Sequence, residues 1–215
     1  LEGGYQNNRK MGMHTVHRFV ENVFEELDTL NEWYFDKADY TLYFYPGKDI
    51  NLATALFEIP QLKSLFEFRG TEQNPVSNIS IEGLELTQTL RTFMETKEPL
   101  LRSDWTTYRG GAVVLEGAVN CAIKECYFNT VGGNAIYFSN YNRSNEVSGC
   151  HIAYAGASGV SFVGSPEAVR SPSFEYNEFV PLERIERTPG PRSNNFPAQC
   201  LVYNNLMHDL GQTEK

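Results

Sequence analysis

The sequence predicts an all-β fold, a right-handed parallel β-helix in which the chain winds through successive coils of short strands. One observation is a strand-like segment, opened by glycine or alanine, that occurs three times at intervals of 23 and 24 residues. Another is a set of further short apolar segments that recur in phase with it. A period in the low twenties with a short strand per repeat is typical of solenoids. The three copies of the segment cover residues 110–117, 133–140 and 157–164.

The repeats can be aligned residue by residue. Val113, Ile136 and Val160 occupy equivalent positions. Because side chains alternate between the two faces of a strand, we expect these three to stack inward and build a continuous core. A second pair of segments, 120–128 and 145–152, repeats in the same phase. Each coil should therefore contain three short strands. A leucine-rich horseshoe has a similar period, but its L-x-x-L-x-L pattern and its helical segment are absent.

Further coils are less regular. Residues 65–70 and 78–86 are interpreted as the first coil, residues 173–179 as part of a fourth, and residues 201–208 as the start of a fifth. Two long insertions, 87–109 and 165–198, interrupt the coils. Loops of this length in a compact domain are usually functional or disordered. We therefore expect the insertions to be functional lips or disordered segments, and not idle connectors.

Residues 1–60 differ in kind from the coils of residues 61–215. Apolar residues at helical spacing predict a helix over His17–Leu27. Two aromatic-rich runs, 32–36 and 41–46, are separated by a short polar segment, which predicts a β-hairpin. We interpret residues 1–60 as a cap or small β module for the open end of the solenoid, because an uncapped coil exposes apolar surface and strand edges.

Composition excludes several classes of function. The formal net charge is −9, whereas nucleic acids and anionic membranes require a basic surface. No run of eighteen apolar residues is present, so we expect no membrane-spanning segment. The chain opens with Leu-Glu-Gly-Gly-Tyr rather than with a signal peptide, and we interpret it as a mature fragment.

The four cysteines form no C-x-x-C pair. Cys126 and Cys150 are 24 residues apart, which places them at equivalent positions of adjacent coils. We expect them to be free thiols of the core. A disulfide between them is the alternative, although stacked strands rarely give the required dihedral angle.

Metal and cofactor chemistry find little support. The only histidines at ligand-like spacing are His14 and His17, which lack a nearby third ligand, so we expect no metal site. No glycine-rich phosphate loop and no Gly-x-Ser-x-Gly motif are present, and we expect no organic cofactor. Glycosidases need a pair of carboxyl groups. Glu116 is the single acidic residue at the outward positions of the repeated strands. No catalytic residue is therefore assigned.

Residues within the second copy of the repeat and just after it suggest a binding surface for sugars. Aromatic faces, amides and a guanidinium group together suit the recognition of a carbohydrate. The alternative is that the asparagines satisfy backbone groups at the corners of coils while Tyr141 and Arg143 pack on a loop. The candidate substrate-binding residues are Asn134, Tyr137, Asn140, Tyr141 and Arg143.

Two other groups of residues are possible contributors. Trp105, Tyr108 and Arg109 end the first insertion, and they either form one lip of a groove or anchor the loop. His208 and Asp209 form an adjacent pair that is catalytic or, more often for such pairs, structural.

Several runs together resemble a known family. They are Arg18–Leu27, Glu32–Tyr34 with Leu42–Pro46, Trp105–Val113, Gly133–Arg143 and Met207–Gly211. These runs resemble bacterial secreted β-helix proteins, and in particular glycoside hydrolase family 141. The resemblance covers nearly the whole chain. It implies a pectate-lyase-like solenoid, secretion or periplasmic localisation, and activity on plant cell-wall polysaccharides, including those that contain fucose and xylose.

The resemblance also implies that such proteins continue for several coils beyond the segment resembling 208–215, and that their acidic catalytic residues lie there. The chain therefore resembles the front portion of a hydrolase, for which paired-carboxylate acid/base catalysis is expected. Two alternatives stay open, namely a non-catalytic glycan-binding β-helix and a structural solenoid. An open last coil would also favour self-association through strand edges.

Overall fold

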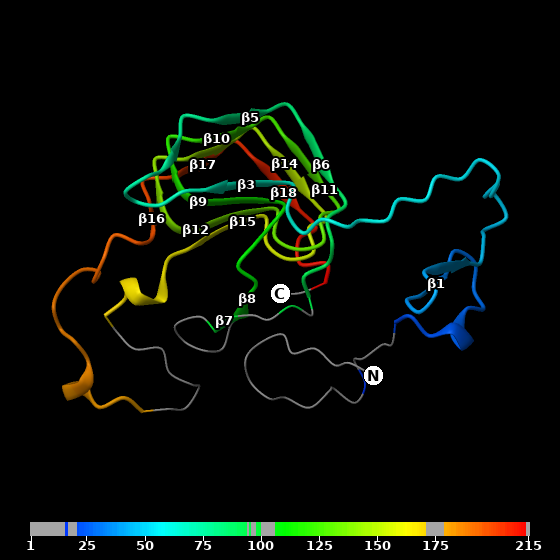
Figure 1. The fold of residues 1–215 in the computed structure, drawn as a ribbon, viewed down its shortest axis with the longest axis horizontal. Coiled ribbons are helices and arrows are strands. Elements are labelled where there is room, and N and C mark those ends of the chain that lie inside the picture. Colours follow the sequence, from blue (N-terminus) through cyan, green and yellow to red (C-terminus); the bar gives the residue numbers. More distant parts are fainter. Residues whose placement is uncertain are drawn as a thin grey trace. The chain divides into compact units, whose positions relative to one another are not determined.

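The computed structural model describes residues 16, 21–93, 95, 98–99, 106–170 and 179–213. The chain divides into two compact units, Met11–Ile59 and one that contains Pro60–Lys215 (Figure 1). Both are built from β-strands. Helix in the described ranges is limited to three short 3₁₀ turns, which are η1 (Phe24–Glu26), η2 (Pro166–Ala168) and η3 (Leu182–Arg184). The prediction of an all-β protein is confirmed.

The smaller unit contains the hairpin that the sequence predicted. Strands β1 (Trp33–Asp36) and β2 (Thr41–Phe44) pair in antiparallel fashion. The predicted helix over residues 17–27 was wrong in its described part, which holds only η1, while residues 17–20 lie outside the described residues. The reason is Asn22, which has a left-handed backbone with φ of 58°. Its side-chain amide bonds the backbone N–H and C=O of Phe35, so the segment is tied to the hairpin.

The larger unit is built from three parallel sheets of four main strands each (Figure 1). We call them sheets 1, 2 and 3. Sheet 1 consists of β3 (Phe66–Arg69), β9 (Val113–Val119), β12 (Ile136–Arg143) and β15 (Val160–Val163). Sheet 2 consists of β5 (Ser80–Glu82), β10 (Ala122–Lys124), β13 (Glu146–Ser148) and β17 (Leu201–Tyr203). Sheet 3 consists of β6 (Glu85–Thr87), β11 (Tyr127–Asn129), β14 (His151–Ala153) and β18 (Leu206–His208).

Consecutive strands visit the three sheets in turn, so each coil of chain contributes one strand to every sheet. Val113 pairs with Ile136, which pairs with Val160, as the repeats predicted. The last coil corrects the prediction, because β17 and β18 pair with β13 and β14. Residues 201–208 therefore complete the fourth coil, which β15 begins, and do not start a fifth. The strand predicted at 173–179 lies, up to residue 178, outside the described residues.

Sheet 1 has one further feature, a break at the same place in every coil. In the first coil β4 (Val76–Ser77) resumes the line of β3, and in the fourth β16 (Pro197–Ala198) resumes the line of β15. In β12 the break is a bulge between Ser139 and Asn142. The segments at the break are residues 70–75 in the first coil, 117 in the second, 140–141 in the third and 164–196 in the fourth.

The corners of the coils share one backbone conformation. Left-handed residues occur at three equivalent places in each coil, which allows the chain to turn sharply between strands. They are Asn78, Asn120, Ser144 and Gln199 after sheet 1, Gly83, Glu125, Gly149 and Asn204 after sheet 2, and Gln88, Thr130, Tyr154 and Asp209 after sheet 3.

Buried asparagines tie neighbouring coils together. The Asn145 side chain accepts a hydrogen bond from the Cys121 N–H at 2.9 Å and donates to the Ala118 carbonyl at 3.0 Å. At the corner after sheet 2, Asn205 makes the same two kinds of bond between the third and fourth coils, since it accepts from the Cys150 N–H and donates to the Val147 carbonyl. The cysteines are free, and Cys121, Cys126 and Cys150 are buried, which confirms the prediction of free core thiols.

The two ends of the stack differ in burial. Inward side chains of the first coil are covered, since Phe68, Ile81 and Leu86 are all nearly inaccessible. In the fourth coil Phe162 stacks on Phe138 with ring centroids 4.5 Å apart, yet 42% of Phe162 is exposed. Val202 is 40% exposed. The apolar interior therefore reaches the surface beside β15 and β17.

Candidate functional site

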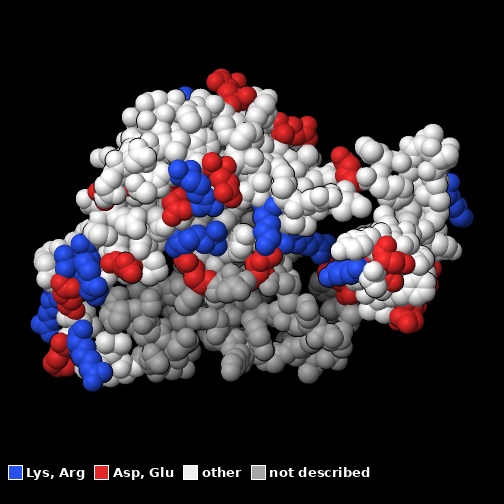
Figure 2. Space-filling view, viewed as in Figure 1, with Lys and Arg blue, Asp and Glu red and all other residues white. Residues whose placement is uncertain are grey.

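A continuous polar network crosses the outer face of sheet 1. Charged side chains of both signs lie interleaved over β3, β9 and β12 in the space-filling view, with no large patch of one sign (Figure 2). Ion pairs and hydrogen bonds connect five charged side chains and one asparagine in series on this face. In order, they are Glu67, Arg69, Glu116, Asn140, Arg109 and Glu98.

One half of the network is placed by strand register. Arg69 on β3 lies opposite Glu116 on β9, and its Nη1 is 2.6 Å from Glu116 Oε2. Arg69 also binds Glu67 at 3.1 Å. The hydrogen bond from Arg69 and its charge lower the pKa of Glu67, although partial burial opposes this. The other oxygen of Glu116 accepts a hydrogen bond from the Asn140 amide.

The bulge in β12 presents Asn140 to the network. Asn140 has a left-handed backbone, and Gly117 does so at the matching break in β9. One residue of β9 faces two of β12 there, which interrupts the alternation of side chains. As a result the Asn140 amide can donate to Glu116 on one side while its carbonyl accepts from Arg109 on the other.

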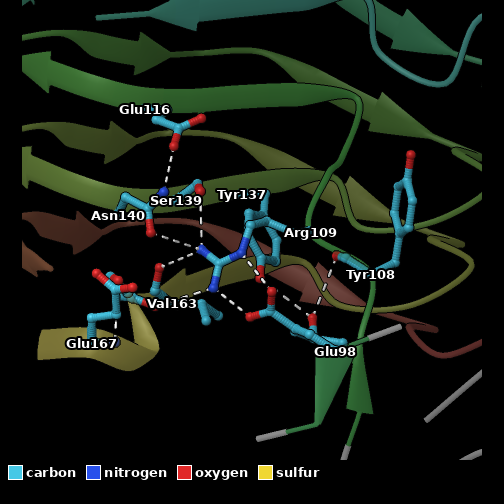
Figure 3. Close-up of polar contacts among 12 residues, drawn as sticks. Glu98, Tyr108, Arg109, Glu116, Tyr137, Ser139, Asn140, Val163 and Glu167 are labelled. Atoms are coloured by element: carbon cyan, nitrogen blue, oxygen red, sulfur yellow. Dashed lines mark hydrogen bonds and ion pairs between the residues drawn. The ribbon is translucent and has the colours of Figure 1, made fainter. Parts of the chain in front are cut away.

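Arg109 is the centre of the other half (Figure 3). It comes from the end of the first insertion, next to the antiparallel pair β7 (Glu98–Pro99) and β8 (Thr106–Thr107). Its guanidinium pairs with both oxygens of Glu98 and donates to Ser139 Oγ at 3.0 Å. It also donates to the carbonyls of Val163 and Gly164, each at 3.1 Å. One side chain thereby connects the insertion to two strands of sheet 1.

The surroundings of Arg109 reinforce its charge. Burial lowers its pKa, but the hydrogen bond to Glu98 and the nearby Tyr137 and carboxylates outweigh this, so the pKa is raised. Tyr137 lies beneath the insertion and is fully buried. Burial raises the pKa of its hydroxyl, and the contact with Thr107 and the charge of Arg109 oppose the shift in part.

A third carboxylate borders the network from the fourth coil. Glu167 lies in η2, and Figure 3 draws it on the Val163 side of the network. The backbone N–H of Glu167 bonds to Ser165. Its carboxylate is exposed and makes no hydrogen bond or ion pair with any residue in the described ranges. It therefore differs from Glu98 and Glu116, which are both held by arginine.

The predicted sugar-binding residues fall into different environments. Asn134 and Tyr137 are buried, so neither presents a surface to a ligand in this conformation. The Asn134 amide donates to the carbonyls of Tyr108 and Gly110, as the corner interpretation had it. Asn140 belongs to the network. The guanidinium group of Arg143 lies against the rings of Tyr141 and Phe196, with Cζ 4.4 Å from the centroid of Tyr141 and 5.1 Å from that of Phe196.

Arg143 has a structural task in addition. It donates to the carbonyls of Phe196 and Asn194, the latter at 2.9 Å, and so fixes the returning end of the second insertion. Binding of a ligand by Asn140, Tyr141 and Arg143 stays a prediction. Trp105, His14 and His17 lie outside the described residues. The part of the chain that the structure describes holds no group of three or more His, Cys, Asp or Glu arranged to bind a metal.

Sequence reasoning missed four members of the site, which are Glu67, Arg69, Glu98 and Glu167. Arg69 could have been found, because 65–70 and 112–117 both end in glycine and align Arg69 with Glu116. Glu98 and Glu167 lie in the insertions, where no repeat gives their position. The pattern of the strands carries no information about which insertion residues return to the sheet.

Comparison with solved structures finds a related fold. The chain is similar to a protein named "Glycoside hydrolase", with a TM-score of 0.66 and 21% sequence identity. The alignment covers 89% of this chain and 35% of that protein, so the chain spans about a third of its length. No family model matches the chain, and no curated protein matches it either. Across the described ranges, no helix has the length and apolar character needed to cross a bilayer.

Proposed function

We propose that this chain belongs to a bacterial carbohydrate-active protein, secreted or periplasmic, built as a right-handed parallel β-helix, and that it acts as part of a glycoside hydrolase on plant-type polysaccharide. The observation that carries the proposal is the fold shared with a protein named "Glycoside hydrolase". Three parallel sheets visited in turn by each coil support the β-helix assignment. The outer face of sheet 1 would bind the glycan.

The polar network supplies what a glycan requires. Sugars are recognised through their hydroxyl groups, which pair with amide, carboxylate and guanidinium groups in fixed positions. Glu116, Asn140 and Arg109 hold one another in place, so little side-chain freedom would be lost on binding. Tyr141, whose ring lies against Arg143, would flank this surface.

Hydrolysis by the paired-carboxylate route needs two carboxyl groups in different environments. Glu116 is held by Arg69 and Asn140, whereas Glu167 is exposed and unengaged among the described residues. In the proposed arrangement Glu116 and Glu167 form the pair, one as proton donor to the leaving oxygen and the other as base or nucleophile. Neither role needs a metal or an organic cofactor.

The test is product release by this chain from xylan, rhamnogalacturonan and fucosylated oligosaccharides, followed by chromatography. Glu116→Gln and Glu167→Gln each remove a charge with little change of shape. Each is expected to lower the rate about 10²- to 10⁴-fold. Glu183→Gln, an exposed glutamate of η3, is the matched control and should keep the wild-type rate. Full activity in both Glu116→Gln and Glu167→Gln would refute the assigned pair.

A non-catalytic glycan-binding protein is the second candidate, and the engaged state of the network favours it. Both Glu98 and Glu116 are neutralised by arginine, which suits binding more than turnover. This function predicts that calorimetry detects oligosaccharide binding without product release, and that Glu116→Gln weakens it. Self-association through the exposed edge of the fourth coil is part of either proposal. Light scattering that shows a monomer at every concentration would contradict it.

A further inference from the structure

A second cluster of titratable side chains lies on sheet 3, apart from the polar network of sheet 1. His151 on β14 and His208 on β18 face each other, with 2.8 Å between their Nε2 atoms. Tyr127 on β11 stacks on His151 at 4.6 Å, and Tyr154 meets His208 edge-on at 5.7 Å. The carboxylate of Asp209 is 2.7 Å from His208 Nδ1.

The two imidazole rings point directly at each other. Their centroids are 5.0 Å apart, and the Nε2 atoms are 2.8 Å apart. The difference between these two distances is nearly twice the distance from the centre of an imidazole ring to its own Nε2 atom. The Nε2 atoms must therefore lie close to the line that joins the ring centres. This is the geometry of a straight N–H···N hydrogen bond, in which one ring donates and the other accepts.

Asp209 decides which ring donates. Its carboxylate accepts a hydrogen bond from His208 Nδ1–H, so in the neutral ring the His208 Nε2 carries no proton and accepts. His151 Nε2–H is then the donor. One added proton leaves the bond in place, because a charged His208 can donate to a neutral His151. Two added protons put a hydrogen on both Nε2 atoms, which removes the acceptor and opposes two positive charges.

The bond holds the last strand of sheet 3. Strand β18 pairs with β14 on one side and has no partner on the other among the described strands. Its first amide, that of Leu206, donates to Cys150 O at 2.9 Å. The groups that face the imidazole pair are Tyr127, Tyr154 and Asp209, with Glu85 of β6 in register beyond Tyr127. A single nearby carboxylate cannot balance two imidazolium charges.

We propose that the His151–His208 pair is a proton-controlled latch, which holds β18 on β14 and releases it when both imidazoles become charged. Histidine is the side chain that ordinarily changes charge between about pH 5 and 8. Acidification therefore loosens the end of the stack where the apolar interior already reaches the surface. The latch does not depend on the proposed carbohydrate activity, because it involves neither the network nor the insertions.

The test is amide hydrogen exchange of β18 at about pH 7.5 and about pH 5, corrected for the intrinsic exchange rate. In the wild type, protection of the β18 amides should fall about tenfold or more on acidification, as for the loss of one hydrogen bond. His151→Phe keeps the ring that stacks on Tyr127 but removes the nitrogen. It should show low protection at both pH values. Tyr127→Phe, which keeps the stack and the pair, should respond as the wild type does.

A second measurement needs no variant and stays decisive even if His151→Phe does not fold. Nuclear magnetic resonance of the ¹⁵N-labelled protein detects coupling between two nitrogens that share a hydrogen-bonded proton. Coupling between the Nε2 atoms of His151 and His208 is expected near neutral pH and is lost in acid. Absence of this coupling near neutral pH, or protection of β18 that does not depend on pH in the wild type, would overturn the proposal.

Discussion

Gly117→Ala is expected to destabilise the stack at the break in sheet 1, where the backbones of the first and second coils approach each other closely. Gly117 has φ of +62°, and a Cβ built there would lie 2.1 Å from the carbonyl carbon of Gly70. It would also lie 2.3 Å from Gly70 O and 2.4 Å from Thr71 N. All three are backbone atoms of the neighbouring coil, so no side-chain rotation relieves the contact.

The magnitude follows from two separate costs. An alanine in the left-handed region costs about 1–2 kcal/mol. Forcing an extra carbon into packed backbone adds about 1–3 kcal/mol, because the strands must separate. Gly117→Ala should therefore lower the free energy of unfolding by about 2–5 kcal/mol. Gly83→Ala is the matched control, because Gly83 has φ of +68° and no atom within 4 Å of its Cβ position. It should show the first cost alone.

The assay is urea unfolding followed by β-sheet circular dichroism, with the slope m compared between variants. An unchanged m shows that the same surface unfolds in each protein. If Gly117→Ala and Gly83→Ala lose the same free energy within about 0.5 kcal/mol, the close approach of the two coils does not carry the cost. The reasoning about the break in sheet 1 would then be refuted.

Three further predictions test the interior and the surface of the stack. Asn145→Ala leaves the Cys121 N–H and the Ala118 carbonyl unpaired in the core and should lower the free energy of unfolding by about 2–4 kcal/mol in urea titrations, whereas Asn205→Ala, at the half-open end, should cost less. In the native protein a thiol reagent should fail to modify the buried Cys121, Cys126 and Cys150, and after unfolding mass spectrometry should find all four cysteines modified. Burial also raises the pKa of the Cys150 thiol, which slows its reaction further. Hydrogen bonds from Ser148 and Tyr203, together with Lys124, lower the pKa of Glu146, so the stability that Glu146 contributes is present above its unfolded-state pKa and is lost as pH falls through its folded-state pKa. The melting temperature of Glu146→Gln should therefore fall less steeply than that of the wild type below about pH 5. Parallel melting curves for the two proteins would contradict this.

Much of the larger unit could be predicted from the sequence. The stacking of Val113, Ile136 and Val160 follows from a repeat that preserves length, apolar character and alternation, and these are the properties that fix register in a sheet. The boundary of the fourth coil could not be found in this way. The second insertion separates β15 from β17, so residues 201–208 looked like a new start when read by spacing alone.

The candidate site was less accessible to sequence reasoning. Tyr137 occupies an outward position, and outward positions of a sheet are expected to meet solvent. Its burial comes from the insertion, which Arg109 fixes to Ser139 and to the carbonyl of Val163. Such contacts join segments that share no period. A repeat predicts the strands that every coil shares, whereas Glu98, Arg109 and Glu167 of the site come from the two insertions, which the other coils lack.

The break in sheet 1 has a consequence for how this surface can vary. At one position the chain leaves the stack for a single residue in one coil and for residues 164–196 in another, yet the strands resume in register each time. Segments of very different length are thus accommodated at this break without disturbing the core. Asn140, a member of the network, lies at the break in the third coil, and Glu167 lies at the break in the fourth. The outer surface of sheet 1 can thus change by exchange of the segments at the break, while the coils behind them stay the same.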